Sequence, residues 1–337
     1  MEVKLAIPRP MPGYAAAILM LIMLTPALVS MAMSVVATDY TARMALGVFA
    51  IFMFVLFALA LTELSRKQRL FGRLRSLAEE LMPGLSFSGS AVRLPKPMHV
   101  VPGVFRALGT WRVICPGKGS TSHYYYKAVF EPIGPGELKS QVELAELPRG
   151  FTIFSSSNTN YLEAPAVGLE ADGQVLVLAL IDPGRVAFSR ERLGLTVRHE
   201  DEWASASVEL GPRELRGTIN RSTSGRARGA RLELMGELDA EVSGLSAHDE
   251  VAITLGYAEG AWAQASYALP PGRPTLIITA EGIPANYLIR EVLGLGERAL
   301  AGFSRGRYQL RLVLDLPLRK DVSTSVELPI GPPRADL

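Results

Sequence analysis

Two long apolar stretches stand near the start of the chain, and no charged residue interrupts either of them. The first runs from Tyr14 to Ala37 and the second from Met44 to Thr62. A helix rises about 1.5 Å per residue and a bilayer core is about 30 Å thick, so roughly 20 residues cross it. Each stretch is therefore long enough to span a membrane. A run with no polar face also disfavours a core helix of a soluble protein.

The two stretches are separated only by Thr38–Arg43, and a connection this short forces them into an antiparallel hairpin. Pro26 predicts a kink in the first helix, which spanning helices tolerate. A cleaved signal peptide is the alternative for the first stretch, because basic residues precede it. Its apolar run exceeds the roughly 7–15 residues of a signal core, and a second span follows at once. The sequence therefore predicts an N-terminal tail at 1–13 and a two-span anchor at 14–62.

Basic residues are distributed unevenly around this hairpin. Lys4 and Arg9 precede it, and the connecting loop has Arg43 offset by Asp39. Five more follow the second span: Arg66, Lys67, Arg69, Arg73 and Arg75. Lys and Arg are retained on the cytoplasmic side of a membrane. We therefore expect both termini and the soluble region on the cytoplasmic face of the cell membrane, with the short loop outside.

Residues 63–84 predict a basic amphipathic helix that ends at Pro83-Gly84. Its apolar positions recur at helical spacing: Leu70, Phe71, Leu74, Leu77, Ala78 and Leu81. The five basic residues occupy the other face. Such a helix lies at the membrane surface with its basic side chains on anionic headgroups. The alternative is that it continues the second span and packs on the soluble domain, and both interpretations stay open.

From Leu85 onward the pattern changes to short β-branched and aromatic runs bounded by Pro-Gly turns such as Pro102-Gly103 and Pro135-Gly136. Without alternating helices, this pattern predicts antiparallel β-sandwiches. The candidate strands are Val100–Val113, Tyr124–Phe130, Gln141–Leu147, Gln174–Ile181, Leu193–His199, Ala204–Leu210, Ala230–Leu238, Glu250–Tyr257, Thr275–Ala280, Tyr308–Leu314 and Ser323–Leu328.

This number of strands favours two sandwich domains, at 85–211 and 212–331, with the boundary at Gly211-Pro212 and a tail at 332–337. A helical insertion is expected near 284–300, where Pro284 suits a first helical turn. The predicted fold class is a membrane-anchored, mainly β protein whose two antiparallel sandwiches are Ig-like or arrestin-like. The late strand pair Tyr308–Pro317 and Val326–Ile330 resembles the closing strands of arrestin-like tandem sandwiches. That resemblance implies a protein-binding adaptor.

Candidate chemistry is sparse. The net charge is +2, and a single cysteine, Cys115, precludes an intramolecular disulfide. Pro116–Ser122 is rich in glycine and serine but departs from a phosphate-binding loop, because Gly119 stands where Ser or Thr is needed. The four histidines lack metal-ligand spacing, and the acidic run His199–Glu202 places consecutive carboxylates in diverging directions. We therefore predict no metal, cofactor or catalytic residue, although a dispersed site is compatible with any sequence.

An arginine-rich stretch follows Gly211 and contains Arg213, Arg216, Arg221, Arg226, Arg228 and Arg231. Such a stretch suits a nucleic-acid backbone, anionic headgroups or an acidic protein. No aromatic residue interleaves for base stacking, which disfavours nucleic acid. We therefore expect lipid or protein contacts here. The function that fits best is a non-enzymatic interaction or scaffold protein; the alternatives are an extracytoplasmic envelope or surface protein, and a membrane-bound enzyme.

Overall fold

A computed structural model describes residues 2–9, 13–88, 91–113, 121–143, 147, 150–171, 173–182, 187–268, 273–296, 298–302, 307–317, 319–328 and 330–331. Cys115, residues 116–120 and the tail at 332–337 lie outside these ranges. The chain divides into a helical unit, Ile7–Glu80, and a β unit that combines Met1–Ala6 with Leu81–Leu337.

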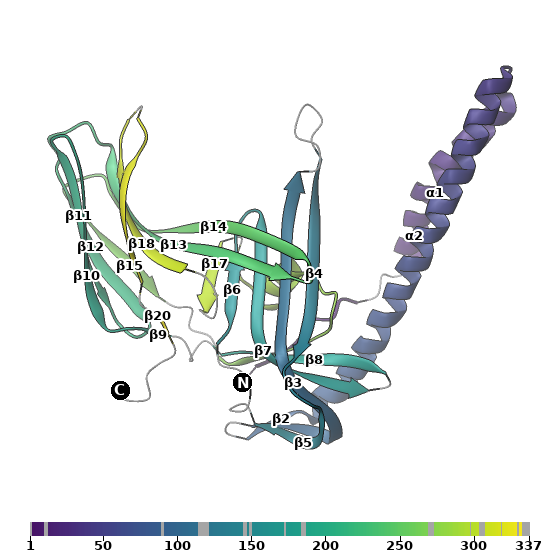
Figure 1. The fold of residues 1–337 in the computed structure, drawn as a ribbon, viewed down its shortest axis with the longest axis horizontal. Coiled ribbons are helices and arrows are strands. Elements are labelled where there is room, and N and C mark those ends of the chain that lie inside the picture. The colour runs from purple at the N-terminus through teal and green to yellow at the C-terminus, as the bar shows by residue number, and fades with distance from the viewer. Residues whose placement is uncertain are drawn as a thin grey trace. The chain divides into compact units, whose positions relative to one another are not determined.

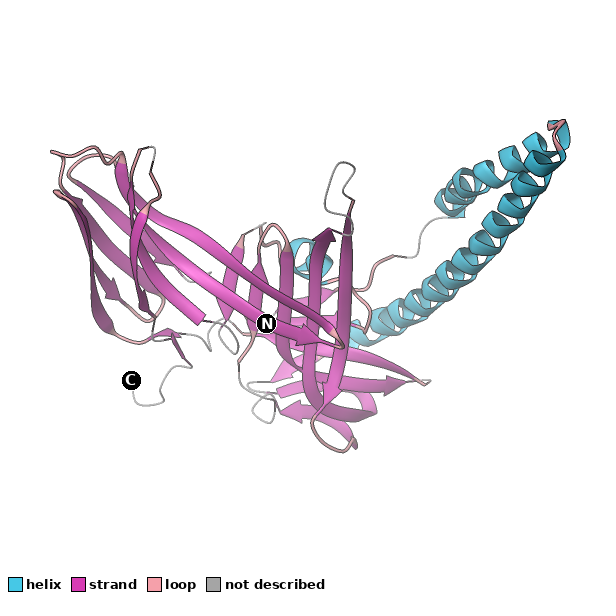
Figure 2. Ribbon diagram, turned by 45° about the horizontal axis from the view of Figure 1, so that its top comes forward, coloured by secondary structure: helices cyan, strands magenta, loops and turns pink. Residues whose placement is uncertain are grey.

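The helical unit contains α1 (Gly13–Val36) and α2 (Tyr40–Leu81), which run antiparallel to each other (Figures 1 and 2). Asp39 caps the start of α2, because its carboxylate accepts hydrogen bonds from the Thr41 hydroxyl and the Ala42 amide. Arg43 donates to the carbonyls of Ser34 and Val35 at 3.2 and 3.1 Å. These carbonyls belong to the last turn of α1, where helices leave acceptors unpaired.

Among the described residues, one helix, Tyr40–Gly84, is long and apolar enough to cross a membrane. Helix α2 contains no proline and continues unbroken through the predicted amphipathic segment. Leu74 and Ala78 on its apolar face are buried, as is Leu81 at its end. The basic segment is therefore a direct extension of the apolar helix.

The β unit is built around a mainly antiparallel sheet of ten strands. Its strands are β1 (Glu2–Leu5), β2 (Ser86–Ser88), β3 (Ala91–Val113), β4 (Ser122–Pro132), β5 (Glu137–Glu143), β6 (Thr152–Ser155), β7 (Thr159–Ala171), β8 (Gln174–Ile181), β16 (Thr275–Thr279) and β17 (Ala299–Gly302). Continuous apolar runs form β8 and β16, whose side chains are almost all buried. Such runs indicate strands covered on both faces.

Strand β1 is the sheet's one parallel partner among the described pairings. It lies beside β16, with Val3 opposite Leu276 and Leu5 opposite Ile278. Ala6 extends the pairing by donating its amide to the Ile278 carbonyl at 2.8 Å. The N-terminal residues are thus part of the same sheet as strands almost 300 residues later.

A helical turn packs on β3, β4 and β7, and consists of α3 (Ala285–Tyr287) and the π-helical turn η4 (Leu288–Val292). The helix expected near 284–300 is therefore shorter than its apolar stripe suggested. Gly294 has a φ of +68°, the left-handed conformation that ends helices, and Ala299 begins β17.

Two four-stranded sheets pack face to face and form the sandwich. One contains β10 (Glu191–His199), β11 (Glu202–Leu210), β12 (Glu214–Arg221) and β15 (Trp262–Ala268). The other contains β14 (Leu245–Ala258), β13 (Gly229–Val242), β18 (Arg307–Asp315) and β19 (Val322–Glu327). Buried and exposed residues alternate along β11, as they do in a sheet with one covered face. A further pair joins β9 (Ala187–Phe188) to β20 (Ile330–Gly331).

Gly211-Pro212, expected at a domain boundary, forms the turn between β11 and β12, which are paired neighbours in one sheet. The long β13–β14 hairpin connects the sandwich to the ten-stranded sheet (Figure 1). Its turn uses Ser243 and Gly244, both with positive φ, as tight hairpin turns require. Near this turn, Arg112 of β3 donates to the Ser246 carbonyl at 2.7 Å, and Ser156 bonds to Asp249.

Candidate interaction surface

The side of the β10–β11–β12–β15 sheet that points away from the sandwich core is a polar face, which we call the outer face. Its residues occupy alternate positions on the four strands, so strand geometry directs them to one side. They are Arg192, Thr196, Arg198, Trp203, Ser205, Ser207, Glu209, Glu214, Arg216, Thr218, Asn220, Trp262, Gln264 and Ser266. Small hydroxyl and amide side chains fill its middle.

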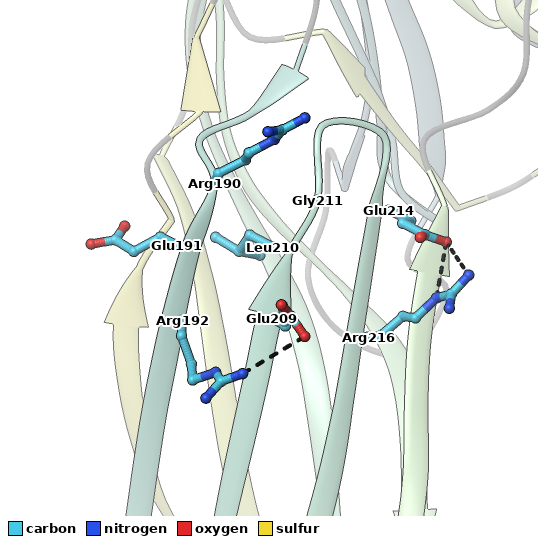
Figure 3. Close-up of a pocket in the computed structure, with 8 residues that line it drawn as sticks. All are labelled: Arg190, Glu191, Arg192, Glu209, Leu210, Gly211, Glu214 and Arg216. Atoms are coloured by element: carbon cyan, nitrogen blue, oxygen red, sulfur yellow. Dashed lines mark hydrogen bonds and ion pairs between the residues drawn. The ribbon is translucent and has the colours of Figure 1, made fainter. Parts of the chain in front are cut away.

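A shallow hollow of about 550 Å³ lies at one end of the outer face (Figure 3). A second hollow, of about 530 Å³, shares Arg192, Glu209 and Arg216 with it and extends to the middle of the face. Arg192 lies 4.0 Å from Glu209 across β10 and β11, and Arg216 lies 2.9 Å from Glu214 along β12. All four side chains are about half exposed or more. Exposed ion pairs contribute at most about 1 kcal/mol each. These four side chains can therefore leave their ion pairs and bind a partner with little loss of stability.

Two tryptophans stand on the other half of the outer face. Trp203 is 41% exposed and Trp262 is 62% exposed. Their backbones are fixed, because Trp203 exchanges hydrogen bonds with Ser222 and Trp262 pairs with Asn220. Exposed tryptophan on a rigid strand, beside arginine, is the residue combination that dominates the energy of protein interfaces.

The loop that follows β12 is held from inside by two buried charged residues. Glu202 accepts hydrogen bonds from the backbone amides of Arg226 and Ala227, the latter at 2.9 Å. Arg221 donates to the carbonyls of Ser222 and Ala227, both at 3.1 Å. A Cβ at Gly225 would overlap the Glu202 carboxylate, so glycine is required there. The loop is therefore pre-shaped beside Trp203.

The six arginines of the predicted cluster do not form one patch. Arg213 and Arg216 lie near the β11–β12 turn, whereas Arg226 and Arg228 are exposed in the loop at the far end of β12. Arg221 between them is buried. Arg231 lies on the other sheet of the sandwich, 2.7 Å from Glu233 and 2.9 Å from Asp321. The eight-residue strand β12 separates the two ends by about 27 Å.

The five basic residues on α2 divide into two groups. Arg66, Lys67, Arg69 and Arg73 are exposed. Arg75 is half-buried, because it donates to the Ile7 carbonyl at 2.7 Å and lies 2.8 Å from Glu79. Arg75 therefore joins Ile7 to the helix within the helical unit.

The acidic run after β10 is split by the β10–β11 turn. Glu200 points outward and accepts a hydrogen bond from Arg319 at 3.0 Å, which lowers the pKa of its carboxyl. Glu202 points into the sandwich instead. Among the described residues, no group of three or more His, Cys, Asp and Glu side chains could hold a metal ion.

Sequence reasoning missed a partly buried ionic network in the ten-stranded sheet. Glu163 of β7 accepts hydrogen bonds from the Tyr161 hydroxyl at 2.7 Å and from Arg106 of β3 at 2.8 Å. Arg106 also pairs with Glu131 of β4. Glu131 and Glu163 stand 25 and 57 positions after Arg106, so no short sequence motif indicates the network. Because each partner satisfies another's charge, the network holds β3, β4 and β7 together.

No protein-family model matches the chain, and no curated protein matches it.

Proposed function

We propose that this chain is a membrane-anchored, non-enzymatic interaction protein that presents its β unit to a protein partner at the cytoplasmic face of the membrane. The observation that carries the interaction role is the outer face, which combines rigid exposed tryptophans with loosely paired arginine and glutamate side chains. Four strands about 4.8 Å apart and about 30 Å long give a face of roughly 570 Å². A contact of that size suits a transient complex.

The pairing of β1 with β16 supports a two-span anchor. A strand and its hydrogen-bonded partner lie on the same side of any membrane, so the chain between Leu5 and Ser86 crosses an even number of times. If α2 crosses, α1 crosses as well. Helix α1 has 24 residues and runs antiparallel beside α2, which suits this role.

The length of α2 supports a stalk between the bilayer and the β unit. The 19 residues after Thr62 extend about 28 Å beyond the proposed span. The headgroup layer adds only about 6 Å to each side of the hydrocarbon core. Arg66, Lys67 and Arg69, within about 10 Å of the span's end, can reach anionic headgroups. Arg73 and Arg75 stand about 17 and 20 Å away, beyond that layer.

Cysteine labelling tests the orientation. Replacement of the sole cysteine by Cys115→Ser allows one new thiol at a time, Thr41→Cys in the first turn of α2, beside the inter-helix loop, or Ser325→Cys on the exposed side of β19. A membrane-impermeant maleimide should label the first in intact cells and the second only after permeabilisation. The opposite pattern would establish the extracytoplasmic alternative.

Site-specific crosslinking tests the interaction role. A photoreactive amino acid at Ser207, in the middle of the outer face, should give one discrete protein adduct in cells. The same group at Ser325, on the opposite sheet, is the matched control and should give none. The double variant Trp203→Ala/Trp262→Ala should remove the Ser207 adduct. Equal crosslinking at both positions, or none at Ser207, would contradict the proposal.

A further inference from the structure

The end of the β3–β4 hairpin has a chemistry that the interaction role does not explain. Strand β3 pairs with β7 as far as Thr110 but continues with β4 to Val113, so only two strands form the tip (Figure 1). Trp111 is 48% exposed and Val113 58% exposed, while Tyr125 and Tyr126 are also exposed. Exposed apolar side chains this concentrated mark a contact surface.

Aromatic rings occupy both faces of the β3–β4 hairpin, at the tip and in the two residue pairs just before it. Trp111 and Tyr124 lie opposite each other with ring centroids 5.3 Å apart, and Tyr126 continues the row at 6.2 Å from Tyr124. Tyr125 points to the other face, because adjacent strand residues alternate. A protein surface docked on a sheet covers one face only. An interfacial lipid layer surrounds an inserted tip on every side.

The charge of this hairpin suits an anionic surface. Between Thr110 and Lys127, at the end of the hairpin, the sequence contains three basic residues and no Asp or Glu. Lys127 and His123 are exposed near the aromatic rings. Tyr and Trp prefer the headgroup region of a bilayer, where the ring is apolar and the OH or NH is wet. Basic residues beside them gain from anionic lipids.

The hairpin is also long and braced. Its paired segment, from Gly103 to Val113 on β3, measures about 37 Å. Arg112 fixes the hairpin to the β13–β14 hairpin through its bond to the Ser246 carbonyl. A rigid projection loses little conformational entropy when it docks.

We infer that the tip of the β3–β4 hairpin is a second membrane contact, which seats Trp111, Tyr125 and Tyr126 in the interfacial layer of an anionic bilayer. This contact rests on the proposed anchoring and adds to it. The stalk holds the β unit near the membrane, and the hairpin fixes its tilt. The outer face is then presented in one orientation.

Tryptophan fluorescence tests the contact on the full chain, reconstituted in vesicles of phosphatidylglycerol with brominated acyl chains. The chain has three tryptophans, so Trp203→Phe/Trp262→Phe leaves Trp111 as the single reporter. Brominated lipid should quench Trp111 strongly in anionic vesicles and weakly in phosphatidylcholine or in high salt. The variant Trp111→Phe/Trp203→Phe, which reports from Trp262, should stay unquenched in all three.

Lys127→Glu, added to the Trp203→Phe/Trp262→Phe variant, changes the charge of the hairpin by two units. It should lower the ratio of docked to undocked hairpin about fivefold for each unit. The matched control Lys320→Glu, on the exposed β18–β19 turn, should leave quenching unchanged. Resistance to alkaline carbonate extraction reports the anchor separately. A chain that resists extraction but shows unquenched Trp111 overturns the hairpin contact alone. Quenching of Trp111 by single-stranded nucleic acid instead of lipid overturns it as well.

Discussion

At the scale of single residues, Glu202 has the largest expected effect on the outer face. Glu202 is 8% exposed, and its carboxylate accepts hydrogen bonds from two backbone amides of the Ser222–Arg228 loop. Arg221 is buried on the neighbouring strand. Removing the carboxylate charge weakens the acceptor on which the two buried loop amides depend. Arg221 holds the same loop through the carbonyls of Ser222 and Ala227.

Glu202→Gln should therefore destabilise the β unit by about 2 kcal/mol. The reason is that the neutral amide oxygen of glutamine is a weaker acceptor for the two backbone amides than the charged carboxylate oxygen. Trypsin should then cleave after Arg226 faster than in the unmodified chain. Glu200→Gln is the matched control, because its pair with Arg319 is fully exposed to solvent and contributes little to stability. Equal cleavage rates in the two variants would contradict the role assigned to Glu202.

Tyr124 makes the ten-stranded sheet sensitive to alkaline pH. Burial raises its pKa to about 12. A phenol with a higher pKa in the folded chain binds its proton more tightly there, so its contribution to stability is complete below about pH 10. The contribution is lost as the pH rises towards 12. Tyr124→Phe should reduce the alkaline fall in the thermal midpoint, and Tyr125→Phe, at an exposed position, should leave it unchanged. Burial also raises the pKa of Tyr308, so part of the fall will persist.

At the scale of elements, sequence patterns predicted what depends on local periodicity. Gln174–Ile181 was predicted as a strand with the bounds of β8, because its apolar run is continuous. Strand β7 was missed, since Pro165 and Gly168 lower its apparent β propensity. The arginines around Gly211 look like one cluster in sequence, yet a single extended strand separates them. Each residue of a strand adds more than 3 Å of length, so residues that are close in sequence can lie far apart in space.

The sequence left open whether residues 63–84 form a separate helix, and the structure answers this question. The segment 63–84 could lie flat on the membrane or continue the preceding helix, and both fit its amphipathic pattern. No residue in it breaks the backbone before Met82, and α2 is continuous. The structure favours the continuation, in which only the first basic residues lie near headgroups.

Arg43 should determine how firmly the helical hairpin closes. It joins the first turn of α2 to the last carbonyls of α1, where a positive charge also favours the helix dipole by about 1 kcal/mol. Arg43→Ala should therefore raise amide exchange across Val36–Thr41 about fivefold, measured on the reconstituted chain. Arg66→Ala, exposed on the same helix, should not change exchange in that segment. Unchanged exchange in Arg43→Ala would show that the loop closes without this residue.

At the scale of the whole molecule, β1 is the part that sequence could not predict. The segment Glu2–Leu5 is only four residues long, and its partner lies more than 270 positions away. Short strands gain their stability from the sheet that receives them, so their own pattern is uninformative. This small strand nevertheless constrains the membrane topology most. It precedes both helices in sequence and pairs with β16, which follows them, so the two ends of the helical hairpin must lie on the same side of a membrane.

An engineered disulfide tests that pairing directly. In the Cys115→Ser background, Val3→Cys and Leu276→Cys stand opposite each other in the parallel β1–β16 pair. Neighbouring strands lie about 4.8 Å apart, which is within the range of Cα separations that a disulfide can bridge. Mild oxidation of native membranes should therefore link the two positions. After proteolytic cleavage between them, the fragments should migrate together until a reductant is added.

The pair Val3→Cys and Val177→Cys is the matched control, because Val177 lies on β8, one strand further from β1. It should stay unlinked under the same oxidation. A bond at position 276 requires both ends of the helical hairpin on one side of the membrane, and therefore an even number of crossings. If the 3–276 pair stays reduced, the N-terminal strand is not held by the sheet, and the support for a second crossing by α1 is lost. The experiment therefore tests whether the proposed anchor crosses the membrane an even number of times.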